Sequence, residues 1–125
     1  MKIQTQKYND VTVISLQGEM DSDCIELVKD VLISALRPPA DGSAQQEANI
    51  VTFQSGIVFE MDELNFIDSS GLEFLLWARD YCIENNCQLR LAALNENCRK
   101  ILEITRLENE FACYGELAEA VKSLV

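Results

Sequence analysis

The chain has 125 residues and a formal net charge of −11, from 21 acidic and 10 basic residues, and 48% of its residues are hydrophobic. This length and hydrophobic content indicate one folded domain with its own core. The excess of negative charge argues against nucleic acid and against an anionic membrane surface as partners. No apolar stretch approaches the roughly 18 residues of a membrane span, and residues 1–10 lack the apolar core of a signal peptide, so we expect a cytoplasmic protein.

Missing residue types exclude several kinds of catalytic site. The sequence contains no histidine, which excludes Ser-His-Asp and Cys-His nucleophile pairs and His-ligated zinc. The five cysteines show no C-x-x-C spacing, so we expect reduced, buried thiols and no metal site. Ser69 and Ser70 do not fit the G-x-S-x-G pattern of a nucleophilic serine. We therefore expect no catalytic residue, no cofactor and no enzymatic activity.

The N-terminal part of the chain is predicted to form a hairpin and a helix. Residues 3–8 and 11–16 predict two strands joined at Asn9-Asp10, and both faces of the second strand carry apolar residues. Gly18 breaks the second strand. Asp21-Ser22 can cap the next helix. Apolar residues then recur at helical spacing, and they are Ile25, Val28, Leu32, Ala35 and Leu36.

The middle of the chain predicts a loop followed by a buried strand. Pro38-Pro39 ends the helix, because the residue before a proline avoids the helical region. The following residues are polar, and we expect a loop insertion over 37–56. Two short apolar runs, 50–53 and 57–61, lie around Gln54-Ser55-Gly56. Either they pair as a hairpin or only the second is a core strand, and we favour the second run as the core strand.

The C-terminal part alternates helices and strands. The pattern predicts a helix from Ser69 to about Asn86, a strand at 89–93, a helix capped by Asn95 and a short strand at 111–114. A closing helix carries Leu117, Val121 and Leu124 on one face. Two strands followed by alternating helices and strands predict a single α/β domain with a mixed sheet, an N-terminal hairpin and helices packed on it.

The sequence D-S-S-G-L at 68–72 is a well-formed helix start. Asp68 can act as the N-cap, because its carboxylate can accept a hydrogen bond from the amide of Ser70 or Gly71. Ile67 and Leu72 then occupy the two positions of a hydrophobic staple. Glycine in a helix interior costs up to ~1 kcal/mol, so Gly71 suggests that some group approaches the backbone closely there.

Ser69 would be the first residue of that helix, with its hydroxyl directed outward. A phosphate at this position is favoured by free amides and by the helix dipole, by roughly 0.3–1 kcal/mol, so it could be added without unfolding the domain. It would also add about −1.5 to −2 charges and repel or block a partner packed against this surface. Simple helix capping explains the same residues, and the sequence is compatible with both interpretations.

Three segments in chain order resemble the STAS domain family, specifically its anti-sigma-factor antagonist type. They are G-E-M-D at 18–21, F-E-M-D-E-L-N-F-I-D-S-S-G-L at 59–72 and L-R-L-A-A-L at 89–94. The likeness extends over residues 1–125 and implies a mixed sheet with helices packed on it. The chain departs from the family in the length of the loop insertion at 37–56 and in Glu73, where small residues are common.

The resemblance implies a phosphorylation switch in signal transduction and transcription regulation. In the family, a serine kinase that is also an anti-sigma factor phosphorylates the first serine of the motif, which is Ser69 here. The unphosphorylated protein binds the kinase and frees the sigma factor, the phosphorylated form is released, and a metal-dependent PP2C-type phosphatase restores it. Asp68 is implied as the cap beside this serine, and Gly71 as the contact that admits the partner. Further candidates for partner contact are Ser70, Leu72, Asp21 and Ser22.

Other assignments stay open at this point. STAS proteins also serve as constitutive accessory subunits of lipid-transport or other regulatory complexes, in which the motif only caps the helix and docks. Asp21 and Ser22 fit either a helix cap or a partner contact, since the loop before the first helix lies near the phosphorylation site in the family. Trp77 lies off the main apolar stripe of its helix, and either core packing or a place beside the partner surface fits it.

Overall fold

The protein folds around one five-stranded mixed sheet. The computed structural model describes residues 1–8, 10–36 and 56–124. Within these residues the elements are β1 (Lys2–Tyr8), β2 (Val11–Met20), α1 (Ile25–Leu36), β3 (Gly56–Ile67), α3 (Ser69–Glu84), β4 (Gln88–Ala92), α4 (Glu96–Ile104), β5 (Ala112–Tyr114) and α5 (Leu117–Lys122).

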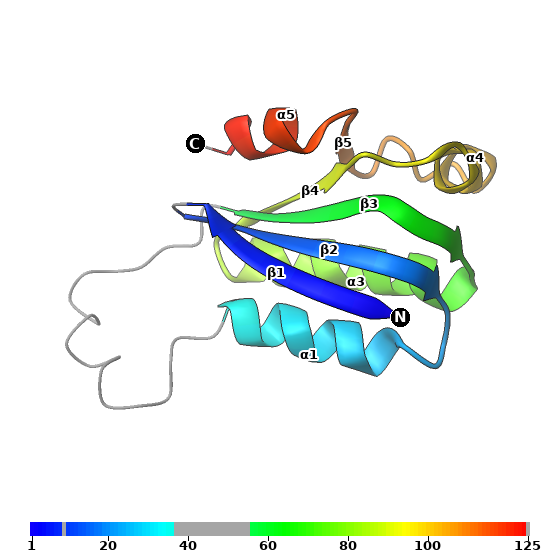
Figure 1. Cartoon of the computed structure of the whole chain (residues 1–125), viewed down its shortest axis with the longest axis horizontal. Coiled ribbons are helices and arrows are strands. Elements are labelled where there is room, and N and C mark those ends of the chain that lie inside the picture. The colour runs from blue at the N-terminus through cyan, green and yellow to red at the C-terminus, as the bar shows by residue number, and fades with distance from the viewer. Residues whose placement is uncertain (9, 37–55, 125) are drawn as a thin grey trace.

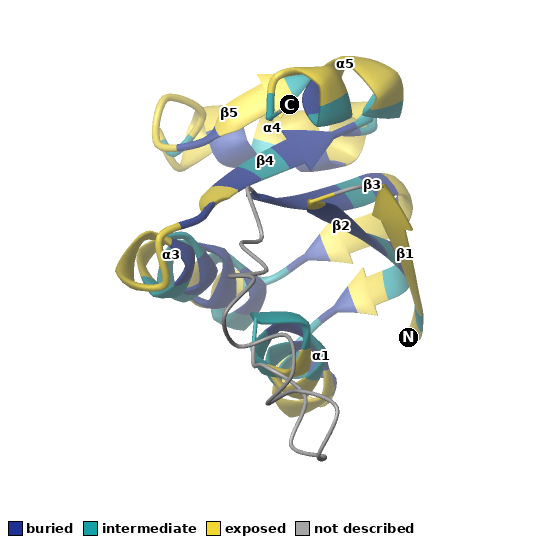
Figure 2. Cartoon of the chain, turned by 90° about the vertical axis from the view of Figure 1, so that its left-hand side faces the viewer, coloured by how far each residue is buried: buried dark blue, intermediate teal, exposed yellow. Residues whose placement is uncertain are grey.

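The strands are ordered in the sheet as they are in the sequence. β1 pairs with β2 in antiparallel fashion, and β2 through β5 are parallel. Helices α1 and α3 cover one face of the sheet, and α4 and α5 cover the other (Figure 1 and Figure 2). The predicted α/β class, mixed sheet and N-terminal hairpin are therefore confirmed.

Both faces of β2 are buried over its first four residues. Ile14 and Leu16 belong to the core beneath α1 and α3, whereas Val11 and Val13 pack with Ala120 of α5 on the opposite face. A strand in a parallel sheet covered on both sides requires apolar residues at nearly every position. Figure 2 shows the resulting buried centre between the two helical layers.

The two central strands are longer than predicted. Gly18 does not end β2, which continues to Met20, and β3 extends six residues beyond Met61 to Ile67. The register shifts after Ser15 and again after Gly18, and at each shift β3 contains the extra residue. Such bulges break strict alternation. The buried residues at this end of β3 are accordingly three apart, and they are Met61, Leu64 and Ile67.

Most of the remaining predicted elements are confirmed to within two residues. Asn95 accepts a hydrogen bond from the amide of Cys98 at 2.9 Å and caps α4, as predicted. The run at 50–53 and all of the predicted insertion except Gly56 lie outside the described residues, and Gly56 is the first residue of β3. The run at 57–61 is confirmed as a core strand.

The cysteines form no disulfide bond. All five are free, and Cys24, Cys82, Cys87 and Cys98 are buried as predicted. Cys113 is exposed, so the prediction of burial was wrong for this residue. It lies on β5, a strand of three residues at the edge of the sheet. An edge strand is covered on fewer sides than a central one, which leaves this residue exposed.

Candidate functional site

The start of α3 is fixed by its N-cap. Asp68 has an extended backbone, and its Oδ1 accepts a hydrogen bond from the amide of Gly71 at 2.9 Å. The Asp68 carbonyl accepts from the amide of Leu72 at 3.0 Å. Ile67 is buried and Leu72 packs against the same core, which fits the predicted staple. The predicted cap is confirmed in residue, partner and register.

Ser69 is exposed at the first position of α3. No group among the described residues forms a hydrogen bond with its hydroxyl, and none accepts from the amides of Ser69 and Ser70. These two donors are the unpaired amides that a helix leaves at its N-terminus. The hydroxyl can therefore be reached from solvent and lies beside free donors that can receive an anion.

Gly71 is buried and packs against the end of β2. A Cβ at this position would lie 2.7 Å from Cγ2 of Ile67 and 2.8 Å from the carbonyl oxygen of Met20. The same carbonyl accepts a hydrogen bond from the amide of Asp68 at 3.1 Å. The predicted close approach to this glycine is confirmed, but the approaching group is Met20 of the same chain. The implied role of Gly71 as the contact that admits the partner stays a prediction.

The segment between β2 and α1 lies beside the start of α3 because Met20 holds the Asp68 amide. Asp21 accepts a hydrogen bond from the amide of Asp23 at 3.0 Å, so it caps this turn instead of α1 itself. The carbonyl of Cys24 accepts from Val28, and the Cys24 thiol donates to the Asp21 carbonyl at 3.3 Å. No pattern in the sequence indicated that Cys24 would hold this turn and begin the hydrogen bonding of α1. Ser22 is exposed at the tip of the turn.

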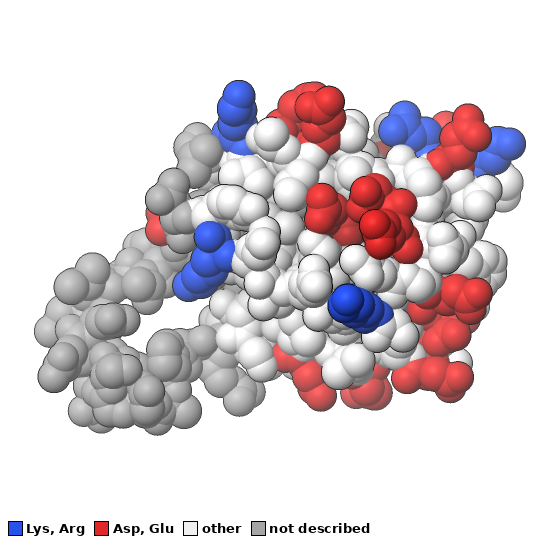
Figure 3. Space-filling view, in the orientation of Figure 1, with Lys and Arg blue, Asp and Glu red and all other residues white. Residues whose placement is uncertain are grey.

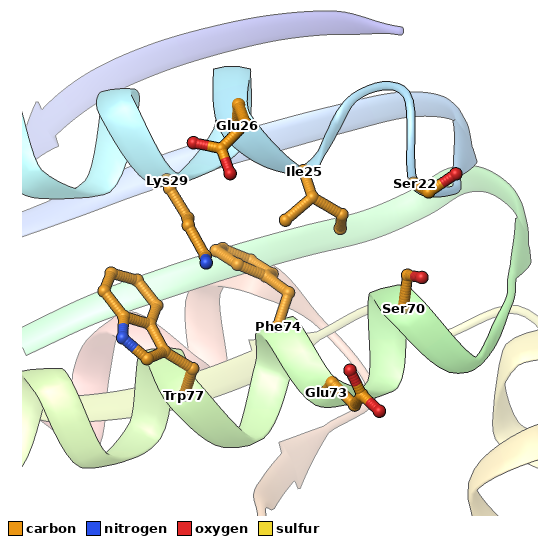
Figure 4. A pocket seen from close by; sticks show the side chains of 8 residues that line it. All are labelled: Ser22, Ile25, Glu26, Lys29, Ser70, Glu73, Phe74 and Trp77. Atoms are coloured by element: carbon orange, nitrogen blue, oxygen red, sulfur yellow. The ribbon is translucent and has the colours of Figure 1, made fainter.

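A groove of about 380 Å³ runs between α1 and α3 and begins beside the motif (Figure 4). Ser22 from the turn and Ser70 from α3 lie at one end of it, and Lys29 and Trp77 lie at the other. The structure thus brings together predicted residues from two separate motifs. Ile25, Glu26, Glu73 and Phe74 complete the lining.

Trp77 packs against the core, as one of its two interpretations predicted, and it also lines the groove. Its place beside a partner surface stays a prediction. Its ring stacks on Tyr81 at a centroid distance of 4.9 Å and meets Phe74 at 5.9 Å. The Nζ atom of Lys29 lies 5.1 Å from the centroid of the Trp77 ring, within the range of a cation–π interaction. This tryptophan is the only one in the chain.

Sequence reasoning missed Glu26, Lys29 and Glu73 as parts of a shared site. A signal for them exists, because the lining residues recur at spacings of three and four in each helix. These spacings place side chains on one helix face. The lining residues are Ser22, Ile25, Glu26 and Lys29 on the α1 side, and Ser70, Glu73, Phe74 and Trp77 on α3. The sequence alone could not show that the two faces oppose each other.

The described residues contain neither a helix that could span a membrane nor a group of metal ligands. None of their helices has the length and apolar character to cross a membrane. No three histidine, cysteine, aspartate or glutamate side chains in these parts of the chain are grouped as a metal site would require.

Comparison with known proteins relates this architecture to one family. The STAS domain family matches residues 2–120. No curated protein sequence matches the chain significantly. Among solved structures, a putative anti-sigma factor antagonist from Thermotoga maritima is similar with a TM-score of 0.77 and 17% identity, over 98% of this chain and 93% of that one.

Two further structures are similar at comparably low identity. SpoIIAA of Bacillus in its phosphorylated form has a TM-score of 0.67 and 20% identity, over 99% of this chain and 100% of that one. A sulfate transporter family protein from Wolinella succinogenes has a TM-score of 0.69 and 14% identity, over 92% and 84%. At these identities the likeness concerns the fold, and the family match over residues 2–120 adds the sequence evidence. The chain therefore belongs to the STAS domain family.

Proposed function

We propose that the protein is a non-enzymatic, phosphorylation-controlled binding switch of the anti-sigma factor antagonist type, with Ser69 as the phosphoacceptor. The unphosphorylated form binds a serine kinase that is also an anti-sigma factor, phosphorylation releases it, and a PP2C-type phosphatase restores binding, all in the cytoplasm. One observation carries this proposal, namely the exposed Ser69 hydroxyl on a helix start whose cap is otherwise complete. Structural neighbours described as anti-sigma factor antagonists support it.

The proposed chemistry is a phosphoryl transfer from ATP. The Ser69 Oγ attacks the γ-phosphorus, the bond from that phosphorus to the bridging oxygen of ADP breaks, and the hydroxyl proton passes to a base of the kinase. The role of this chain is to present the hydroxyl in a fixed position. Asp68 contributes by holding the first turn through the Gly71 amide.

The phosphate changes the free energy of folding much less than the free energy of binding to a partner. At the start of α3 the added charge stabilises the fold by about 0.3–1 kcal/mol, because free amides and the helix dipole favour an anion. In a packed interface the same charge lacks counter-charges, and burying an uncompensated charge costs about 3–5 kcal/mol. Phosphorylation at Ser69 can therefore weaken binding by two orders of magnitude or more while the domain keeps its structure.

Incubation with a candidate kinase and Mg-ATP tests the proposal directly. Mass spectrometry should find an addition of about 80 Da on Ser69. Ser69→Ala should abolish the addition, whereas Ser70→Ala serves as the matched control and should keep it, because Ser70 is half-buried in the groove. A label on another residue, or full kinase binding by the phosphorylated protein, would contradict the proposal.

A second candidate function is a constitutive accessory subunit of a transport or other regulatory complex. The similarity to a sulfate transporter family protein favours this alternative. In that case the protein should copurify with a membrane transporter, and neither Ser69→Ala nor Ser69→Asp should change the amount recovered. A loss of recovery that is specific to Ser69→Asp would favour the switch instead.

A further inference from the structure

The groove between α1 and α3 has more negative than positive charge on its walls. Glu26 from α1 and Glu73 from α3 are exposed, and each lines the groove. In the part of the chain that the structure describes, every ion pair involves Arg79, so neither of these carboxylates is paired. Figure 3 shows further acidic side chains along the edge of the molecule formed by α1.

The floor of the groove is apolar, and a lysine of the same chain lies over part of it. Ile25, Phe74 and Trp77 form this floor, and the Lys29 ammonium lies over the Trp77 ring. Aliphatic stems and flat charged groups pack well on such surfaces, and a guanidinium is less strongly hydrated than an ammonium. The groove has carboxylates on opposite walls above an apolar floor. An arginine side chain matches this shape and charge better than any acidic or neutral side chain does.

We propose that this groove receives an arginine side chain of the protein partner, with its guanidinium between Glu26 and Glu73 and its methylene stem on Ile25 and Phe74. The inference rests on the proposed function, because it assigns the groove to the partner that covers Ser69. The groove begins at Ser70, the residue next to Ser69, so one protein surface can cover both. Recognition by the groove is then separate from release by the phosphate.

The single tryptophan makes the test specific. In the ¹⁵N-labelled full chain, Trp77 gives one indole N–H cross-peak, which can be followed during titration with N-acetyl-arginine amide. N-acetyl-citrulline amide is the matched probe, because it keeps the shape of arginine and removes the charge. The arginine probe should cause a saturable shift of this peak, with an affinity roughly five-fold or more above that of the citrulline probe.

Charge-matched variants separate the groove from general electrostatics. Glu26→Gln/Glu73→Gln should abolish the saturable shift. Glu96→Gln/Glu103→Gln removes the same number of charges from exposed positions on α4, which covers the other face of the sheet, and should leave the shift unchanged. Ser69→Ala should also bind the arginine probe normally. A failure of the phosphorylation switch is therefore distinguishable from a failure of the groove assignment.

Four outcomes would overturn the proposal. They are equal shifts from the arginine and citrulline probes, a shift that survives in Glu26→Gln/Glu73→Gln, a stronger response to N-acetyl-glutamate amide, and a shift that depends on protein concentration alone. The third would assign the groove to an acidic group that binds Lys29, and the fourth would assign it to a second copy of the chain.

Discussion

Replacing Gly71 by alanine tests the packing of α3 against β2. The new Cβ would lie 2.7 Å from Ile67 Cγ2, 2.8 Å from the Met20 carbonyl oxygen and 2.9 Å from Met20 Cγ. One of these atoms belongs to the backbone, and it also accepts from the Asp68 amide. Overpacking costs about 1–3 kcal/mol, and alanine regains up to ~1 kcal/mol of helix propensity. We expect a net destabilisation of roughly 1–2 kcal/mol, or a melting temperature lower by roughly 3–10 °C.

Urea unfolding followed by circular dichroism measures this change. Gly115→Ala is the matched control, because a Cβ at Gly115 meets no heavy atom within 4 Å, and its stability should equal or slightly exceed that of the wild type. Equal stability of the two variants would refute the packing argument. A Gly71→Ala protein of full stability that no longer binds its partner would instead support the implied role of this glycine in admitting the partner.

Four further predictions concern the cap, the thiols and the surface ion pair. Asp68→Ala should lower the free energy of unfolding by about 1 kcal/mol, whereas Asp68→Asn, which keeps a capping oxygen, should be nearly neutral in the same urea titration. A thiol reagent at mild pH should modify Cys113 in the folded protein and the buried cysteines only after unfolding. Burial raises the pKa of the Cys98 thiol from 9.0 to about 11. As the pH rises, the unfolded chain therefore loses this proton before the folded chain does, and the free energy of unfolding should fall by roughly 2–3 kcal/mol between about pH 9 and pH 11. Cys98→Ala should reduce this loss. Arg79→Ala breaks an exposed 2.6 Å ion pair with Glu110, so it should lower the free energy of unfolding by less than about 1 kcal/mol. A larger decrease would indicate that Arg79 also contributes to packing.

The sequence predicted best what depends on neighbouring residues. A cap, a staple and an apolar stripe lie within one turn or one helix, so Asp68, Asn95 and the extent of α3 could be predicted to within two residues. The fold class followed from the order of these elements. The exposed position of Ser69 followed in turn from the register that Asp68 sets.

The sequence could not predict what depends on residues far apart in the chain. The bulges of β3 arise from its pairing with β2, so the buried positions at Leu64 and Ile67 lacked a recognisable period. Gly71 was identified as unusual, but only the folded chain shows that Met20 is the group that approaches it. The groove likewise requires α1 and α3 to face each other, which neither helix specifies alone.

The hydrogen bond from the Asp68 amide to the Met20 carbonyl has a consequence for how information leaves this domain. It fixes the turn at the start of α3 to the end of β2, so that turn has little freedom to rearrange. In the proposed switch, phosphorylation would then change only the outer surface of a rigid domain, and no allosteric change of structure would be needed to release the partner. Hydrogen exchange at the Asp68 amide should therefore be equally slow before and after modification.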